Sequence, residues 1–181
     1  MAASPGGIRF VTSLWASHAG RGGRWWRRKT VPELHLPKPK TPLLAADCVV
    51  LGPRGRVLLV RRKFPPFRGQ YALPGGFVEV GETVEAAARR ELEEETGVKA
   101  GRLQLVGVYS DPKRDPRGHT CSAVFLVTGA KGRPKGGDDA AAAEWVADWT
   151  KVDLAFDHAK ILADVRKLRR RQRPRRSDKA S

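Results

Sequence analysis

The sequence predicts an α/β fold, an α/β/α sandwich around a mixed β-sheet. Strand-like segments, a helix, further strand-like segments and a last helix follow one another along the chain, which is the order that such a sandwich needs. The 181 residues have room for one domain of ordinary size with a substantial core, and a second large domain does not fit. We therefore expect a single folded domain over residues 41–168.

The domain begins with strands. After a proline-punctuated lead-in, residues 43–51 and 56–62 are apolar and rich in strand-forming side chains. The turn sequence GPRG between them is a hairpin signal, so we expect these two strands to pair. Residues 71–80 follow as short extended pieces that lead into a helix.

A helix is predicted over residues 84–96, which contain good helix formers. Thr83 is a suitable N-cap because its hydroxyl can accept a hydrogen bond from the first turn. Gly97 is the expected C′ residue, since glycine adopts the left-handed conformation that ends many helices. The acidic run of the chain therefore lies on a helix.

The second half of the domain repeats the order of strands and helix. Residues 103–110, 120–129 and 144–146 are predicted strands, and a last helix begins at about Phe156. Its apolar residues stand at helical spacing: Ile161, Leu162, Val165 and Leu168.

The net charge of +16 is not spread evenly along the chain. Residues 1–30 carry six basic residues and no acid, residues 166–176 carry eight and no acid, and residues 31–165 carry 20 basic against 18 acidic residues. The domain is therefore nearly neutral, while residues 1–40 and 169–181 are basic extensions. We expect disordered, solvated tails. Weak, salt-sensitive contact with RNA, DNA or anionic lipid is the alternative.

The composition favours a soluble cytoplasmic protein. Cys48 and Cys121 lie in apolar runs, which suits buried reduced thiols better than a disulfide framework. No apolar run approaches the roughly 20 residues that span a bilayer, so no membrane partner is expected. The N-terminal segment has arginines, serines and no acid before Glu33, so a mitochondrial transit peptide stays a weaker alternative.

Three glutamates of the first helix point to one side. At about 100° per residue, Glu91, Glu94 and Glu95 fall within one arc, while Glu93 points the opposite way. Like charges this close need a neutralising partner. Hard oxygen ligands without nearby Cys or His select Mg²⁺ or Mn²⁺, and such sites commonly take substrate phosphates as further ligands. A solvated acidic face is the other reading of such a helix.

Arg90 stands beside Glu91, and Glu82, just before the helix, is a natural ion-pair partner for it. The whole stretch resembles the Nudix box, G-x5-E-x7-R-E-U-x-E-E-x-G-U with U aliphatic. The matching residues are Gly76, Glu82, Arg90, Glu91, Leu92, Glu94, Glu95, Gly97 and Val98. The resemblance implies that Glu91, Glu94 and Glu95 bind metal or activate water. It also implies that the Gly76 carbonyl ligates metal and that Arg90 is structural.

The segment 110–120 carries a cationic loop. Lys113, Arg114, Arg117 and His119 lie close together there, and such side chains suit phosphate or ribose oxygens. A polar loop without a ligand is the alternative. Together with LPGGFVEVGE, the loop resembles the small ADP-ribose pyrophosphatases of the Nudix family.

Aromatic residues offer a place for a nucleobase. Phe64, Phe67 and Tyr71 flank a loop rich in proline and glycine, where an aromatic ring can stack on a base. Packing in the core is the alternative for each of them. We take Phe67 as a substrate-binding candidate together with Arg114, Arg117 and His119.

The general base is less well defined. The family usually takes a further acid from a late loop, where this sequence has DDAAAAEWVADW with alanines in the middle. Asp138 and Asp139 precede the strand that contains Glu144. The candidates for the base are Glu91, Asp139 and Glu144, in that order.

These observations predict a Mg²⁺-dependent pyrophosphohydrolase for a nucleoside diphosphate linked to another group, with ADP-ribose cleaved to AMP and ribose 5-phosphate as the leading case. Hydrolysis of an oxidised or non-canonical nucleoside triphosphate is the first alternative. A nucleotide-sensing or RNA-associated module that uses its basic tails is the second. A homodimer is compatible with the sequence.

Overall fold

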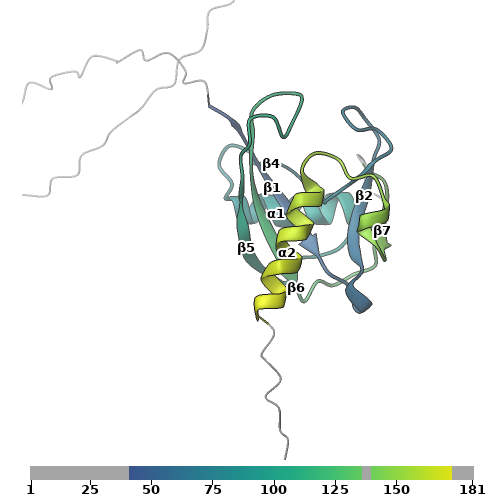
Figure 1. The fold of residues 1–181 in the computed structure, drawn as a ribbon. Helices are drawn as coiled ribbons and strands as arrows, with labels where there is room; N and C mark the ends of the chain where they lie inside the picture. Colours follow the sequence, from purple (N-terminus) through teal and green to yellow (C-terminus); the bar gives the residue numbers. More distant parts are fainter. Residues whose placement is uncertain (1–40, 136–139, 173–181) are drawn as a thin grey trace, which may run out of the picture. The chain divides into compact units, whose positions relative to one another are not determined.

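The computed structural model describes residues 41–135 and 140–172. This part of the chain is the expected α/β/α sandwich, with helix α2 (His158–Gln172) crossing in front of the strands and helix α1 (Val84–Thr96) behind them in Figure 1. Within the described ranges, no helix is both long and apolar enough to cross a membrane. The N-terminal segment considered as a transit peptide lies outside the described residues.

The larger sheet has four strands in the order β4-β1-β6-β5. They are β4 (Gly75–Phe77), β1 (Leu43–Val50), β6 (Thr120–Thr128) and β5 (Arg102–Tyr109). β1 and β6 run parallel, and the other two pairs are antiparallel, so the sheet is mixed as predicted. Parallel strands need a long crossover, and the connection from β1 to β6 carries helix α1.

The smaller sheet is antiparallel and has the order β3-β2-β7. Its strands are β3 (Tyr71–Ala72), β2 (Val57–Arg62) and β7 (Ala140–Val146), and the 3-10 turn η2 (Trp149–Lys151) follows β7. β7 begins before residue 144, where the sequence predicts its start, because a run of alanines carries no β-branched or aromatic signal.

The predicted hairpin between the first two strands is wrong. β1 and β2 belong to different sheets and meet in an isolated bridge between Leu51 and Val57, across the 3-10 turn η1 (Pro53–Gly55). The reason is that β4 and β6 occupy both edges of β1, while β2 lies between β3 and β7. A turn sequence indicates that the chain reverses its direction, but it does not determine which strands pair.

Helix α1 has both of its predicted ends. The Thr83 hydroxyl oxygen accepts a hydrogen bond from the Ala86 amide at 3.1 Å. Gly97 has a φ of 68°, which is the left-handed conformation expected of a C-terminal glycine. The buried apolar residues of α1 that face the core are Ala87, Ala88 and Leu92.

Helix α2 packs on the other face of the strands. Neighbouring strand residues point to opposite faces, and accordingly Cys48 of β1 joins the cluster under α1 while Val49 joins the cluster under α2. The buried apolar residues of α2 are Ile161, Leu162 and Val165. The helix continues to Gln172, beyond residue 168, where the sequence predicts the end of the domain.

Candidate active site

Residues 73–77 form a bend that brings the main chain against α1. The Gly75 amide donates a hydrogen bond to Oε2 of Glu95 at 3.0 Å. A β-carbon on Gly76 would collide with the carboxylate of Glu91. A β-carbon on Gly75 would collide with the Ala46 carbonyl oxygen and with Asp47, so both glycines are needed where the backbone packs too closely for a side chain.

The carboxylates of Glu91 and Glu95 line a cavity beside this bend. Burial raises the pKa of Glu95 to about 8, and the nearby charge of Glu91 adds to this rise against the hydrogen bond from Gly75. Burial also raises the pKa of Glu91, although Arg90 opposes the rise. Two half-buried carboxylates whose pKa values are raised favour a cation beside them.

Arg90 holds the acidic face of α1 in place. Its guanidinium donates to Glu82 at 2.7 Å, to Glu91 at 2.8 Å and to Glu94 at 3.2 Å. It also donates to the carbonyl of Phe77 at 3.1 Å, which ties the helix to the end of the bend. The hydrogen bond from Arg90 lowers the pKa of Glu82. The planar fork thus fixes the position of Glu91 relative to the cavity.

The three glutamates expected to converge are divided between two positions. Glu91 and Glu95 line the cavity, whereas Glu94 is 58% exposed and lies against Arg90. Glu93 lies on the other side of α1 and pairs with Lys99 at 3.2 Å, as the helical phase requires. In the described part of the chain, no group of three or more His, Cys, Asp or Glu side chains is placed to hold a metal ion by itself.

The cavity has a volume of about 360 Å³ and combines acidic and basic side chains. Besides the two glutamates, its lining includes four arginines, Arg61, Arg62, Arg114 and Arg117, and three phenylalanines, Phe64, Phe77 and Phe156. Carboxylates suit a cation, and guanidinium groups suit phosphate oxygens. The cavity can therefore receive a phosphate group between the two sets.

Arg114 is a buried part of the cavity wall. Its side chain is 4% exposed, and its guanidinium donates to both carboxylate oxygens of Asp157, at 2.7 Å and 3.1 Å. It also lies 3.7 Å from the carboxylate of Asp47, which accepts a hydrogen bond from Ser122. Arg114 is thus already bound by protein carboxylates, so it is a fixed part of the cavity wall whose charge is compensated by Asp157 and Asp47.

Arg117 is the more accessible arginine of the cationic loop. It pairs with Asp115 at 2.8 Å, and its side chain is 47% exposed. Its guanidinium lies 5.4 Å from the ring centre of Phe77 and 5.6 Å from that of Phe156. The two rings hold the Arg117 guanidinium at the cavity, where it can still donate hydrogen bonds to a ligand.

The other two expected substrate residues lie outside this cavity. Phe67 packs edge-on against Phe156, with ring centres 5.0 Å apart, and lines a neighbouring hollow of about 530 Å³. His119 is exposed, and its Nε2 lies 3.1 Å from the carbonyl of Ser110. The cationic loop therefore brings two of its basic residues, Arg114 and Arg117, to the cavity.

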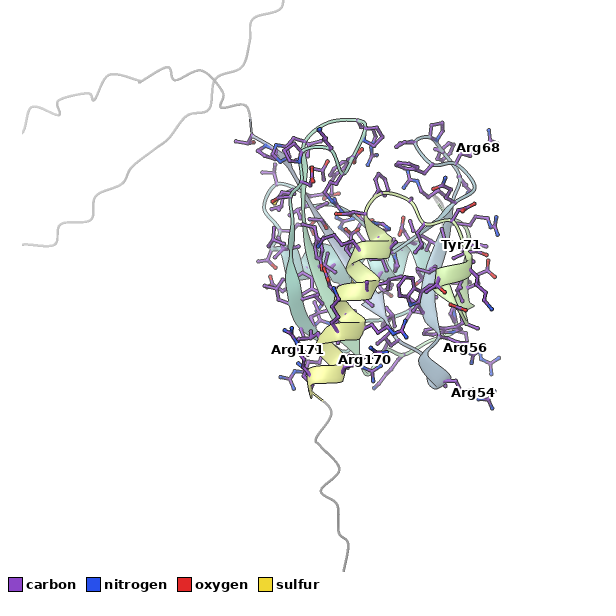
Figure 2. All side chains as sticks on the ribbon, viewed as in Figure 1. Arg54, Arg56, Arg68, Tyr71, Arg170 and Arg171 are labelled. Carbon is purple, nitrogen blue, oxygen red and sulfur yellow. The ribbon has the colours of Figure 1, made fainter. Side chains whose placement is uncertain are left out.

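The three candidates for the general base also differ in whether they line the cavity. Glu91 lines the cavity. Glu144 lies outside the cavity, on the smaller sheet. Its carboxylate accepts a hydrogen bond at 2.6 Å from the hydroxyl of Tyr71, which is labelled in Figure 2. Asp139 lies outside the described residues, together with its neighbour at position 138.

Sequence reasoning missed several residues of the cavity. Asp47 and His158 are buried there, and Nδ1 of His158 accepts a hydrogen bond from the Leu73 amide at 2.9 Å. Burial lowers the pKa of His158. Asp47 had a usable signal, since it is the charged residue of the apolar run 43–51. His158 had none, because only the fold brings it to the bend.

Comparison with known proteins decides the family. Residues 41–171 match the family model described as the NUDIX domain. The chain belongs to the Nudix family. The resemblance read from Gly76, Glu82, Arg90 and the glutamates of α1 is thereby confirmed.

This Nudix chain is 45% identical over 145 residues to the ADP-ribose pyrophosphatase of Methanocaldococcus jannaschii, which covers 78% of this chain and 85% of that protein. The NUDIX domain of Shewanella oneidensis NrtR, crystallised with ADP ribose, superposes with a TM-score of 0.66 at 28% identity, over 71% of this chain and 89% of that one. A bifunctional NMN adenylyltransferase/ADP ribose pyrophosphatase from Francisella tularensis, complexed with AMP and a Mn ion, gives a TM-score of 0.63 at 27% identity, over 73% of this chain and 43% of that one.

Proposed function

We propose that this Nudix protein hydrolyses the diphosphate of ADP-ribose to AMP and ribose 5-phosphate. The observation that carries the proposal is that one cavity is lined both by the carboxylates of Glu91 and Glu95 and by the arginines Arg62, Arg114 and Arg117. The similarity to the M. jannaschii ADP-ribose pyrophosphatase supports this substrate. So does the similarity to a NUDIX domain crystallised with ADP ribose.

The donors at the cavity fit Mg²⁺ or Mn²⁺. Glu91, Glu95 and the Gly76 carbonyl offer only oxygen atoms, and Glu94 stands next to them on α1. Mg²⁺ commonly uses one or two protein carboxylates together with substrate phosphates, so the two glutamates that line the cavity in the described part of the chain are compatible with it. When bound, such a cation supplies charge neutralisation at the diphosphate and activation of water.

The protein's own groups divide the remaining work of the reaction. As water attacks, a new oxygen–phosphorus bond forms, the bridging oxygen–phosphorus bond breaks, and Glu91 accepts a proton from the water. Arg90 keeps Glu91 in position through the 2.8 Å hydrogen bond. Arg117 compensates the negative charge of the phosphate that leaves. Asp139 is the alternative acceptor of the proton.

Two hollows suit the two halves of the substrate. The cavity and the neighbouring hollow share Arg114 and Phe156 in their linings. A volume of about 360 Å³ is at the low end of ligand pockets, so a ligand with two ribose units extends beyond it. We place the diphosphate in the cavity and one nucleoside or ribose arm in the hollow beside Phe67.

A substrate panel tests the proposal. We expect kcat/KM with Mg²⁺ to be highest for ADP-ribose among ADP-ribose, NADH, 8-oxo-dGTP and dATP. A triphosphate in first place would instead support hydrolysis of oxidised or non-canonical nucleotides. Tight binding of ADP-ribose without turnover would support a sensing role.

A further inference from the structure

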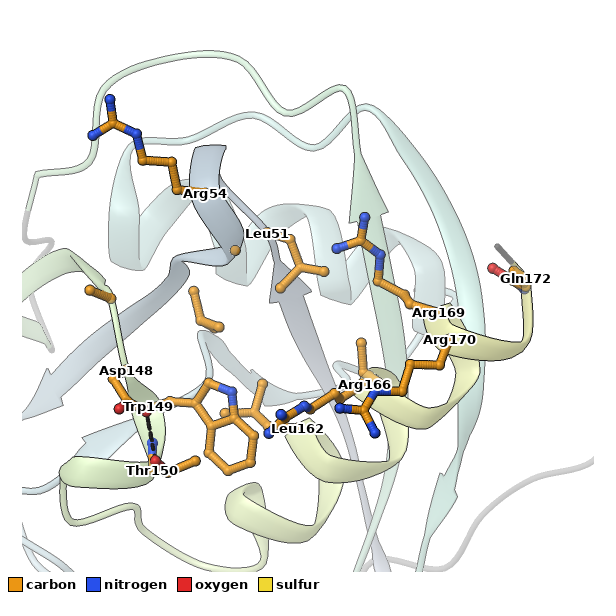
Figure 3. A pocket seen from close by; sticks show the side chains of 14 residues that line it. Leu51, Arg54, Asp148, Trp149, Thr150, Leu162, Arg166, Arg169, Arg170 and Gln172 are labelled. Carbon is orange, nitrogen blue, oxygen red and sulfur yellow. Dashed lines mark hydrogen bonds between the residues drawn. The ribbon is translucent and has the colours of Figure 1, made fainter. Parts of the chain in front are cut away.

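Besides the cavity and the hollow beside Phe67, a groove lies at the other end of α2. This groove has a volume of about 920 Å³ and runs between η1, η2 and the C-terminal half of α2, as Figure 3 shows. None of the residues that line it lines the catalytic cavity. From His158 to Arg170 the helix rises by roughly 18 Å, so the two places are separate on the domain.

The floor of the groove is apolar. Val57, Leu162 and Val165 are buried, and Leu51 and Trp149 are partly buried beside them. In Figure 3 the indole of Trp149 lies next to Leu162, between η2 and α2. A flat aromatic ligand can therefore pack against the apolar floor of the groove without displacing hydrogen bonds of the protein.

The rim of the groove is strongly basic. Arg54, Arg166, Arg169 and Arg170 line it, all four are exposed, and none forms an ion pair or hydrogen bond with another residue of the described ranges. Figure 2 shows Arg54 and Arg170 towards the same end of the domain. Uncompensated guanidinium groups around a concave surface attract anions.

The acid in the lining does not cancel this charge. Asp148 accepts hydrogen bonds from the amide of Thr150 at 3.1 Å and from its hydroxyl at 2.6 Å, and it pairs with Lys151 at 3.5 Å. Its carboxylate is thus used to cap η2. Beyond Gln172 the sequence adds three more arginines before its next acid, Asp178.

We propose that this groove binds a single strand of nucleic acid. A strand offers what both parts of the groove require, because its bases can stack on Trp149 and its successive phosphates can pair with several arginines. A small inorganic anion would leave the apolar floor unused. Four cations spread over η1 and little more than one turn of α2 also exceed what one phosphate can pair with.

Other occupants fit the groove less well. A flat anionic membrane would meet the arginines at the rim and leave the partly buried indole of Trp149 uncovered. The ends of the chain itself carry the wrong charge, since residues 1–40 have eight basic residues against one acid and residues 173–181 have four against one. A single strand is narrow enough to enter a groove and is negatively charged along its length.

The basic rim is tested in the full-length protein by fluorescence anisotropy with a fluorescein-labelled RNA 12-mer. We expect the triple variant Arg166→Gln, Arg169→Gln, Arg170→Gln to weaken binding by about ten-fold or more and to flatten its salt dependence. The matched control is Arg102→Gln, Lys131→Gln, Arg133→Gln, which removes the same charge from exposed residues outside the groove. It should change the affinity by less than about two-fold.

The aromatic floor is tested with an abasic 12-mer of equal charge. We expect the unmodified protein to bind the RNA about ten-fold more tightly than the abasic strand, and Trp149→Leu to remove this preference. The abasic comparison needs no variant, so it stands even if Trp149→Leu does not fold. ADP-ribose hydrolysis by the arginine variant should equal that of its control.

Three results would overturn the proposal. One is equal loss of RNA binding in both triple variants, which would assign the binding to charge in general. Another is equal affinity for RNA and the abasic strand. The third is unchanged RNA binding in the groove variant together with lost binding to phosphatidylserine vesicles, which would assign the arginines to a membrane.

Discussion

The carboxylate of Glu91 occupies the space that a β-carbon on Gly76 would need. This contact joins the bend after β3 to the helix that carries the acidic residues. The Gly76 carbonyl and the Glu91 carboxylate, two of the proposed metal donors, are therefore positioned by the same close approach.

We expect Gly76→Ala to reduce ADP-ribose turnover strongly, because the added methyl group displaces Glu91 from the cavity. Overpacking of this kind costs about 1–3 kcal/mol, so the domain should still fold. The matched control is Gly107→Ala on β5, where a β-carbon would meet its nearest neighbour, a ring carbon of Tyr109, at 3.9 Å. Steady-state kinetics and thermal unfolding of both variants provide the check, and full activity in Gly76→Ala would contradict the arrangement.

The glutamates of α1 should differ sharply in importance. We expect Glu91→Gln, Glu94→Gln and Glu95→Gln each to abolish most hydrolysis, because each removes a charged oxygen donor near the cavity. Glu93→Gln should be nearly silent, since it loses only an exposed pair with Lys99 worth about 0.2–1 kcal/mol. Turnover at saturating Mg²⁺ decides the point, and a large loss in Glu93→Gln would mean that the acidic face is wrongly assigned.

Arg90 should act through the position of Glu91. We expect Arg90→Lys to lower kcat about ten-fold with little change in KM, because a single ammonium group cannot replace a fork that holds three carboxylates. The neighbouring Arg89→Lys is the control, since the Arg89 guanidinium donates to the carbonyls of Ala100 and Gly101 rather than to the glutamates of α1. Equal losses in the two variants would remove any special role for Arg90.

The two arginines of the cationic loop should fail in different ways. Arg117→Ala is expected to lower kcat/KM for ADP-ribose about ten-fold or more while Mg²⁺ binding stays unchanged, because it removes an accessible contact to the ligand. Arg114→Ala should also impair hydrolysis, but with a lower Tm, because it leaves Asp47 and Asp157 without their cation at a cost of about 3–5 kcal/mol. Calorimetry beside kinetics separates these effects. Unchanged kcat/KM in Arg117→Ala would refute its role.

The basic ends should be dispensable for catalysis. We expect a shortened chain of residues 36–172 to turn over ADP-ribose within a few-fold of the full length, since the catalytic candidates all lie inside it. The end point is set at 172 because α2 continues to that residue. A shortened chain that folds by circular dichroism but lacks activity would show that one end completes the site.

The sequence predicts most of the fold because its strongest signals are local. Thr83 and Gly97 mark the ends of α1, and the apolar spacing of Ile161, Leu162 and Val165 marks α2. The pairing of β2 with β7 is not predictable in this way, because the two strands are far apart in the sequence and the turn after β1 suggests a nearer partner.

The candidate site, too, is predictable from the sequence only where its signals are local. The arc that contains Glu91 and Glu95 follows from helical geometry alone, whereas the diversion of Glu94 to Arg90 depends on side-chain conformations that the spacing does not determine. The partners of Arg114 are equally hidden, since Asp47 and Asp157 come from β1 and from the start of the last helix. Such contacts between distant segments exist only after folding.

The hydrogen bond from the Leu73 amide to His158 connects the bend of residues 73–77 to the first turn of α2. An amide whose acceptor belongs to another element exchanges its hydrogen with solvent only when the two elements separate. Opening of the bend on this side requires this hydrogen bond to break, so we expect the Leu73 amide to exchange more slowly than an amide without such an acceptor. Movement of the bend that borders the cavity is thereby coupled to movement of the first turn of α2.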